Sequence, residues 1–521
     1  MKSPATSPQD ILSIDRLGTP VPFSFSENAR IKDIREISRR KKIKVYLVGG
    51  CWRDYFLGKD VTDFDFAVSR DAIGMARAFA KAIKGAFVLL DEEHGCARVV
   101  RKERQGIVTP LEKNLLSESA PTAGEQSSLT GFTFDFADFR AATLQKDLLH
   151  RDFTVNTLCV DINTIGAETK LSDILIDSKA GLRDLKAKKI KMTVEGVFKE
   201  DPLRLVRAFS LQAELGFAIE KKTLERIKKD RDSLKGIAYE RIRDELFKIC
   251  ASKNAAVNFK NMAKVGLLER IMPQVTVMYN VAQGGYHHLD VWAHSLMTVA
   301  ELEGVLQEFS NHEDIGAYLK EPLGADRSRL ALMKLAALLH DIGKPQTRKK
   351  EKGKISFHGH ERVGAEIIKN ISDLLKLSTR EKHALEDMVL WHLRPGYLSN
   401  FENPTPRAVF RYFRDTKEEG ISILLLSLAD QRATRGPMTT KKDQAHHERI
   451  IRNLLRHCLE KKKEKPLVRL INGNDLIRKL KLTPSPIFAK ILNEVEEKQA
   501  MGKVTTKDEA LKLARSIANK K

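Results

Sequence analysis

Cysteine is scarce in this chain, and long apolar runs are absent. The five cysteines, Cys51, Cys96, Cys159, Cys250 and Cys458, are scattered without a C-x-x-C pair. This spacing argues against a zinc knuckle and against a disulfide framework. No run of about 18 uncharged apolar residues occurs, and the first residues lack the apolar segment of a secretion signal. We therefore expect a protein of the reducing cytoplasm that has no membrane association.

Acidic residues are also in the minority. The 521 residues include 69 Asp and Glu against 91 Lys and Arg, which gives a formal net charge of +22 and an isoelectric point near 9.6. Such an excess favours a polyanionic partner, with nucleic acid as the first candidate, because basic side chains bind phosphates and release counterions. A basic surface that only keeps the protein in solution is the alternative.

The length and the 42% hydrophobic content predict roughly three or four globular domains. Up to residue 180 the pattern alternates, with strands expected at 45–48, 63–68 and 87–90 and a helix at 72–83, whereas helical periodicity dominates afterwards. The fold class is therefore α+β. The expected segments are a flexible leader at 1–28, a head at 29–180 with a mobile loop at 116–130, a helical neck at 181–280, a histidine-rich domain at 281–440 and a helical tail at 441–521.

Two carboxylates alternate with aromatic residues in the run Asp63-Phe64-Asp65-Phe66. Because side chains alternate along a strand, Asp63 and Asp65 share one face while the phenylalanines point to the other. Such a pair is unfavourable unless cations lie between the carboxylates. Two hard divalent ions roughly 3.5–4 Å apart suit in-line phosphoryl or nucleotidyl transfer, and magnesium is the natural candidate.

A glycine turn and a later strand supply further candidates. The Gly49-Gly50 turn allows backbone N–H groups to approach a triphosphate, and Arg53 could add charge-assisted bonds. The strand expected at 132–140 carries Asp135 and Asp138, which have opposite parity. At most one of them can face the metal pair, and we favour Asp135.

The order of these motifs resembles the class II tRNA nucleotidyltransferase and bacterial poly(A) polymerase family of the DNA polymerase β-like superfamily. The Gly-Gly turn, the R-D pair and the D-x-D match its first motif, residues 150–158 resemble R-R-D-F-T-x-N-A with His150 replacing the first Arg, and residues 200–204 resemble E-D-x-x-R. The resemblance implies a polymerase β-like head with a mixed sheet, Mg²⁺ as cofactor, and CTP, ATP and an RNA 3′ end as substrates. It implies catalytic roles for Asp63, Asp65 and Asp135, and nucleotide contacts for Gly49, Gly50, Arg53, Asp54, Arg151, Asp152, Asn156, Asp201 and Arg204.

Asp201 and Arg204 are interpreted as readers of the nucleotide base. With Pro202 in the first turn of a helix, the two side chains stand three apart on one face. Asp accepts a bond from the exocyclic amine of C or A, and Arg donates to the neighbouring ring atom, so both bases can be selected without a template. The alternative is that Asp201 only caps the helix.

Six histidine and aspartate residues follow in an order that resembles the HD phosphohydrolase superfamily. His340-Asp341 ends an apolar run and can be delivered to a buried metal ion. Lys344 follows closely and could meet a substrate phosphate. The resemblance implies a divalent transition metal held by His294, His340, Asp341, His360, His392 and Asp430, and hydrolysis of a phosphomonoester or a 2′,3′-cyclic phosphate.

The leading hypothesis is addition of C and A to the 3′ end of tRNA, with an attached HD phosphohydrolase domain and an RNA-binding tail. An A-adding or CC-adding enzyme and a poly(A) polymerase share these motifs, so the sequence leaves them open. A phosphohydrolase with a head that only binds nucleotide is a competitor from another class, and a noncatalytic RNA-binding scaffold is a third. The oligomeric state is left open.

Overall fold

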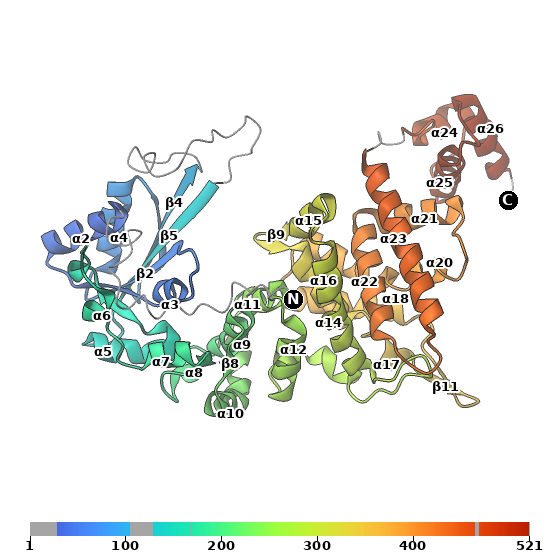
Figure 1. The fold of residues 1–521 in the computed structure, drawn as a ribbon. Coiled ribbons are helices and arrows are strands. Elements are labelled where there is room, and N and C mark those ends of the chain that lie inside the picture. The colour runs from blue at the N-terminus through green and yellow to red at the C-terminus, as the bar shows by residue number, and fades with distance from the viewer. Residues whose placement is uncertain (1–28, 105–128, 167, 464–467, 520–521) are drawn as a thin grey trace, which may run out of the picture. The chain divides into compact units, whose positions relative to one another are not determined.

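The computed structural model describes residues 29–104, 129–166, 168–463 and 468–519; the leader predicted at 1–28 and residues 116–128 of the predicted loop lie outside this part. The chain forms two compact units, residues 1–233 and 234–521 (Figure 1). The division falls within the segment that the sequence assigns to a helical neck. The predicted α+β class is confirmed, since a mixed sheet precedes a body that is almost entirely helical.

The first unit is built on a six-stranded sheet with the order β3-β4-β5-β2-β1-β6. β2 and β5 run parallel, and the other neighbouring strands run antiparallel. Among the strands of the described residues, β3 therefore lies at one edge of the sheet. The strands are β1 Val45–Val48, β2 Asp63–Val68, β3 Ala86–Asp91, β4 Cys96–Arg104, β5 Leu129–Asp138 and β6 Cys159–Asp161.

One face of this sheet is aromatic and covered by helix α4 (Ala72–Ile83). Phe64 stacks on Phe134 and Phe66 on Phe136 across β2 and β5, with ring centroids 5.3 Å and 4.9 Å apart. Phe79 of α4 packs against both pairs. Since side chains alternate, burial of the aromatic rings forces the intervening carboxylates onto the opposite face.

Short helices complete the first unit. α2 and α4 pack together, and α3 follows β1 directly, so that its first turn begins at the Gly-Gly bend. The helices are α2 Ala29–Lys41, α3 Gly50–Phe56, α5 Leu144–Asp147, α6 Leu171–Ile174, α7 Gly181–Lys186, α8 Val197–Glu200, α9 Arg204–Leu215 and α10 Lys221–Asp230. A two-stranded parallel sheet joins β7 Lys189–Ile190 to β8 Ala218–Ile219.

The second unit is a helical body whose core includes α14, α16 and α22. α16 is apolar on nearly every side and is buried along its whole length, as expected for a central helix. Its helices are α11 Tyr239–Ala251, α12 Ala255–Lys264, α13 Leu268–Ile271, α14 Val291–Phe309, α15 Glu313–Lys320, α16 Arg329–Leu339, α17 Lys344–Thr347, α18 His360–Leu374, α19 Thr379–Trp391, α20 Arg394–Leu398, α21 Pro406–Thr416, α22 Gly420–Ala433 and α23 Lys441–Lys463. Two small hairpins pair β9 Pro322–Gly324 with β10 Arg327–Ser328 and β11 Lys349–Glu351 with β12 Lys354–Ser356.

Three helices at the end of the chain have a small core of their own. They are α24 Gly473–Leu480, α25 Ile487–Ala500 and α26 Lys507–Ala518. Leu476, Ile491 and Ala514 are fully buried among them. Among the helices in the described ranges, none is both long and apolar enough to cross a bilayer.

Candidate active site and candidate metal centre

Three carboxylates gather on the open face of the large sheet. Asp65 of β2 lies opposite Asp135 of the parallel strand β5, and Asp63 precedes Asp65 by two residues on the same face. Asp63 is exposed, and Asp65 is half-buried. Asp138 is on the other side of β5, where its Oδ1 accepts a hydrogen bond of 2.9 Å from the Ala72 N–H. The structure thus places Asp135, rather than Asp138, beside the D-x-D pair.

The Gly-Gly bend lies directly against this carboxylate group. Gly49 has φ +94°, and a Cβ atom there would lie 3.0 Å from Asp65 Oδ2 and 3.2 Å from Arg151 Nη1. Only glycine combines that backbone conformation with so close an approach. Burial raises the pKa of Asp65, the Arg151 guanidinium opposes this, and the net shift is upward. A half-buried carboxylate next to two others is a position that favours a bound cation.

Arg98 is a member of this site that the sequence analysis did not identify. Its Nε and Nη2 atoms donate to the two carboxylate oxygens of Asp135, both at 2.7 Å. The hydrogen bonds that Arg98 donates to Asp135 raise the pKa of Arg98, and the charges of Asp63 and Asp65 act in the same direction. Arg98 could have been assigned to the site only from its position on β4 opposite Asp135. That strand register cannot be read from the sequence.

Several predicted nucleotide-binding residues form a buried polar chain. Arg53 donates to Asn156 Oδ1 at 2.8 Å and to Asp54 Oδ2 at 2.8 Å, and Asn156 donates to Asp152 Oδ1 at 3.0 Å. Asp152 Oδ2 lies 3.0 Å from Arg207 Nη2. Burial raises the pKa of Asp152, but Arg207 and the bond from Asn156 outweigh burial and hold it below its ordinary value. In this structure Arg53 and Asn156 hold Asp152 in position.

A cavity of about 350 Å³ joins the carboxylates to the two downstream motifs. The predicted residues Gly49, Gly50, Arg53, Asp54, Asp63 and Asn156 are not part of its lining in the described chain. Arg207, which the sequence analysis did not single out, is part of it; it stands three residues after Arg204 on α9. The predicted site residues that line the cavity are Asp65, Asp135, Arg151, Asp152, Asp201 and Arg204.

The helix of this segment begins later than expected. α9 begins at Arg204, so Pro202 lies before its first turn, and Asp201 is extended, with φ −144° and ψ 99°. The cause is Pro202, because a residue before proline is sterically driven out of the helical region. Asp201 accepts a hydrogen bond of 3.2 Å from the Leu203 N–H, and Arg204 donates to the carbonyl oxygens of Val197 and His150. Both side chains nevertheless reach the same cavity.

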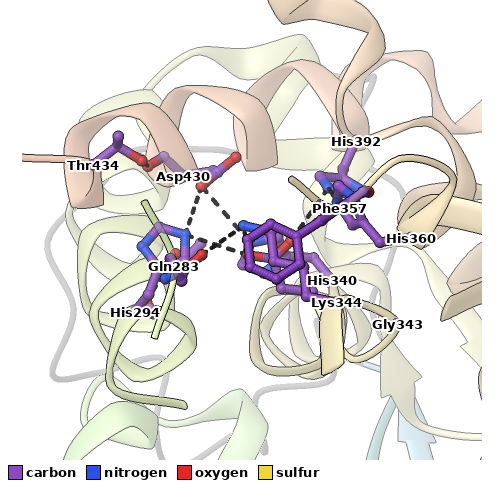
Figure 2. A network of polar contacts seen from close by, with 12 residues as sticks. Gln283, His294, His340, Gly343, Lys344, Phe357, His360, His392, Asp430 and Thr434 are labelled. Carbon is purple, nitrogen blue, oxygen red and sulfur yellow. Dashed lines mark hydrogen bonds and ion pairs between the residues drawn. The ribbon is translucent and has the colours of Figure 1, made fainter. Parts of the chain in front are cut away.

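The histidine region of the second unit forms a buried cluster (Figure 2). Two groups of three have ligand atoms within 4.8 Å of one another: His294, His340 and Asp430, and Asp341, His360 and His392. The Oδ2 atom of Asp341 lies 3.2 Å from His340 Nε2, while its Oδ1 atom lies 3.3 Å from His360 Nε2. The carboxylate of Asp341 therefore faces both groups, one oxygen each.

Backbone carbonyls orient three of these imidazoles. The Nδ1 atoms of His340, His360 and His392 lie 2.7–2.8 Å from the carbonyl oxygens three residues earlier. An Nδ1–H that donates to a carbonyl leaves the Nε2 lone pair free for a metal ion. All three Nε2 atoms lie near Asp341, which is the direction that coordination requires.

The electrostatics of this cluster also fit a bound cation. Burial lowers the pKa of His340, but Asp341 and Asp430 outweigh burial and raise it to about 10. Burial and the nearby imidazoles of His340 and His360 lower the pKa of His392 to about 3. Two buried atoms, His340 Nε2 and Asp341 Oδ2, lie 3.2 Å apart without hydrogen-bond geometry, and Asp341 Oδ2 also pairs with the Lys344 ammonium group. The chemistry of the donor set and the unsatisfied Nε2 atom of His340 suit a divalent metal ion.

Lys344 and two unpredicted neighbours border the cluster. Lys344 is buried, with Nζ 2.6 Å from Asp341 Oδ2 and 2.7 Å from Gln283 Oε1, so it is committed to those partners in this structure. The ring of His287 packs edge-on against His294 at a centroid distance of 4.6 Å. No sequence pattern distinguished Gln283, because glutamine has no place in the H…HD…D order.

The two sites together define the class of protein: a nucleotidyltransferase head in one compact unit and an HD-type domain in the other. The sequence matches four family descriptions in succession. They are the poly A polymerase head domain at residues 45–191, the probable RNA and SrmB-binding site of polymerase A at 216–278, the HD domain at 291–435 and the putative tRNA nucleotidyltransferase domain 2 at 425–514.

Curated relatives give the family. The A-adding tRNA nucleotidyltransferase of Deinococcus radiodurans is 31% identical over 89% of this chain and 93% of its own length. The CC-adding tRNA nucleotidyltransferase of Thermus thermophilus is 28% identical over 89% of this chain and 91% of its own. The multifunctional CCA protein of Neisseria gonorrhoeae is 30% identical over 67% of this chain and 74% of its own. The chain belongs to the tRNA nucleotidyltransferase and poly(A) polymerase family, as its motifs predicted.

Solved structures show the same fold. A CCA-adding enzyme in complex with ATP has a TM-score of 0.58 at 21% identity, with 94% of each chain covered. The Thermotoga maritima CCA-adding enzyme in complex with tRNA has a TM-score of 0.56 at 20% identity, with 96% of this chain and 98% of that chain covered. The polymerase β-like head followed by a helical body is thus shared along almost the whole chain.

Proposed function

We propose that this protein adds C and A, from CTP and ATP, to the 3′ end of tRNA without a template. The observation that carries the proposal is the row of Asp65, Asp135 and Arg98 on the open sheet face, beside a cavity that also reaches the E-D-x-x-R segment. The tRNA nucleotidyltransferase activity of the relatives supports it. All five cysteines are free thiols, which suits a cytoplasmic enzyme.

The proposed reaction joins the RNA 3′-hydroxyl oxygen to the α-phosphorus and breaks its bond to pyrophosphate. Asp63 and Asp65 would hold Mg²⁺, which lowers the pKa of the hydroxyl and neutralises the leaving pyrophosphate when bound. Arg151, which lies next to the Gly49 bend, would contact the phosphates. Asp201 and Arg204 offer an acceptor and a donor to the base edge, a combination that suits C and A.

The test uses three tRNAs that end before, within and after CCA, each with a single labelled nucleoside triphosphate or with both. Addition of C, C and then A to the first tRNA is expected. A single A added only to the tRNA that ends in CC would indicate an A-adding enzyme, and addition that stops after C and C a CC-adding one. Long A tails would indicate a poly(A) polymerase, and no incorporation at all would refute nucleotidyl transfer.

A variant of the exposed residue Asp63 tests whether the paired carboxylates catalyse nucleotidyl transfer. Asp63→Ala should lower incorporation by about a hundredfold or more, because it removes a metal ligand at little cost in folding. ATP binding, measured by equilibrium dialysis, should remain. Asp60→Ala is the matched control, since it removes an exposed carboxylate just before β2. Full activity of Asp63→Ala would contradict the assignment.

A second activity is supported by the two metal-ligand groups that share Asp341. We propose that the HD domain binds a divalent transition metal and hydrolyses a phosphomonoester or a 2′,3′-cyclic phosphate. The metal, when bound, supplies an activated water molecule. His-rich donor sets favour transition metals over magnesium. Such a reaction would trim damaged RNA ends.

Phosphate release tests this second activity. Protein stripped with EDTA should hydrolyse p-nitrophenyl phosphate or 2′,3′-cyclic AMP only after Mn²⁺, Co²⁺ or Ni²⁺ is restored. His340→Ala should abolish this release, whereas nucleotide incorporation should persist because the two sites belong to different compact units. His383→Ala, an exposed histidine of α19, is the control. Hydrolysis that survives in His340→Ala would refute the site.

A further inference from the structure

The edge strand of the large sheet exposes three consecutive apolar side chains. Val88, Leu89 and Leu90 of β3 are 43%, 40% and 50% exposed. Native edge strands are usually guarded by charged residues, so exposed apolar side chains on such a strand mark a candidate binding surface. The exposed apolar side chains of β3 therefore suit contact with a binding partner.

The register of the sheet separates these residues between two faces. Val88 lies opposite Arg98, Arg98 opposite Asp135, and Asp135 opposite Asp65, so Val88 is on the carboxylate face. Leu89 lies opposite Ala97 and points to the other face.

Leu90 occupies a special place in this register. The pairing of β3 with β4 shifts between Leu89 and Asp91, which makes Leu90 the extra residue of a β-bulge. Bulges beside active sites re-aim a side chain. Leu90 lines the same cavity as Asp65 and Asp135, so its exposed apolar surface is continuous with the candidate active site.

The dimensions of this surface suit one nucleotide. β3 lies two strands away from β5, which is about 10 Å at the ordinary spacing between strands. In an in-line displacement the attacking oxygen and the leaving pyrophosphate lie on opposite sides of the phosphorus. Arg151 lies by the Gly49 bend that follows β1, on the far side of β2 from β3. If the triphosphate occupies that side, the RNA end approaches from the β3 side.

We propose that Val88 and Leu90 bind the sugar and base of the 3′-terminal nucleotide of the acceptor RNA and so position its hydroxyl. The inference rests on the proposed nucleotidyl transfer and extends it to the second substrate. An apolar contact makes no hydrogen bond to a base edge, so it accepts different terminal bases. An acceptor end that changes after each addition requires that tolerance.

Steady-state kinetics of the full chain test this surface. Val88→Ser and Leu90→Ser should each raise the KM for a tRNA acceptor by about fivefold, as loss of one apolar contact predicts, and leave the KM for ATP and CTP unchanged. Leu89→Ser is the matched control, because it changes an equally exposed neighbour on the opposite face. The control should keep both KM values.

Each other result overturns the inference. A higher KM for ATP or CTP with an unchanged KM for tRNA would assign the surface to the incoming nucleotide. Equal effects of all three variants, together with a loss of dimers in analytical ultracentrifugation, would assign the strand to a contact between two copies of the chain. An unchanged tRNA KM in both variants, with wild-type incorporation intact, would refute the inference without touching the proposed function. A wild-type protein that incorporates nothing would refute the proposed function instead.

Discussion

Among single residues, Arg98 decides how much negative charge the carboxylate face carries. Its guanidinium binds Asp135 through two parallel hydrogen bonds and interacts electrostatically with Asp63 and Asp65. Two parallel hydrogen bonds fix the orientation of a carboxylate in addition to neutralising its charge. Arg98 therefore both neutralises the site and holds Asp135 in one orientation.

Arg98→Ala should have two opposite effects on the transferase. Loss of one positive charge should lower the Mg²⁺ concentration for half-maximal activity by roughly threefold to fivefold. Loss of the orientation of Asp135 should lower kcat by about tenfold or more. A magnesium titration of incorporation measures both quantities.

Arg101→Ala serves as the control for this titration. Arg101 is on the same strand but on the opposite face, where it donates to the carbonyl oxygen of Ile83. Arg101→Ala removes the same charge as Arg98→Ala, but Asp135 keeps its hydrogen bonds from Arg98. Identical magnesium curves for the two variants would contradict the role given to Arg98.

Among the helices, α19 shows how one buried carboxylate secures an element. Glu381 closes a capping box with Ser378 at the start of α19 and accepts two hydrogen bonds from Arg327, at 2.6 Å and 2.9 Å. Burial raises the pKa of Glu381, but the bonds from Arg327 and Ser378 outweigh burial and hold the pKa below its ordinary value. The helix that delivers His392 to the metal cluster thus depends on an ionised side chain.

Glu381→Gln should destabilise the protein by roughly 2–3 kcal/mol at pH 7, because Arg327 loses its buried charged partner and keeps only the exposed Asp244, at 3.4 Å, among the ion pairs of the described residues. The folded pKa is lower than the unfolded value of about 4.3, so the stabilisation is complete above that pH and is lost as the pH falls through the folded pKa. The difference between wild type and variant in thermal unfolding should therefore shrink below about pH 4.

An exposed glutamate provides the comparison for this measurement. Glu366→Gln on α18 removes the same charge from a side chain that is 71% exposed and paired with the exposed Lys369, so it should change stability by less than about 0.5 kcal/mol. If the effect of Glu381→Gln stayed constant down to pH 3, the ionised carboxylate would not be the source of the stability.

For the chain as a whole, the net charge of +22 predicts how RNA binding responds to salt. Each phosphate contact contributes a slope of about −0.7 to −0.9 to the plot of log affinity against log salt concentration. With about five contacts, tRNA affinity should fall by roughly a hundredfold or more between 50 and 200 mM salt. Fluorescence anisotropy with labelled tRNA measures the slope.

The nucleotide substrates provide the contrast for the salt series. The KM for ATP should change far less than the tRNA affinity, because one mononucleotide meets only the few basic side chains of the cavity, such as Arg151 and Arg207. A tRNA affinity independent of salt would mean that the positive charge serves solubility alone, which is the alternative that composition left open.

Local patterns were sufficient for part of this structure. β1, β2 and α4 have the bounds that alternation and helical periodicity predict, because burial of one face imposes those periods on a short segment. The same alternation puts Asp63 and Asp65 on one face. The family-like order of motifs was enough to assign the chain to its family, although the domain limits and the roles of the site residues stay predictions.

Other features depend on residues that are distant in the chain. The partnership of Arg98 with Asp135 and the exposure of Leu90 beside the cavity both follow from the pairing of β3, β4 and β5, which come from separate segments of the chain. The motif at 200–204 predicted a helix with Pro202 in its first turn, whereas α9 begins at Arg204. Local chemistry therefore specified the carboxylates and histidines of this protein, whereas strand register and helix packing selected their partners, because such contacts are set by the burial of whole faces.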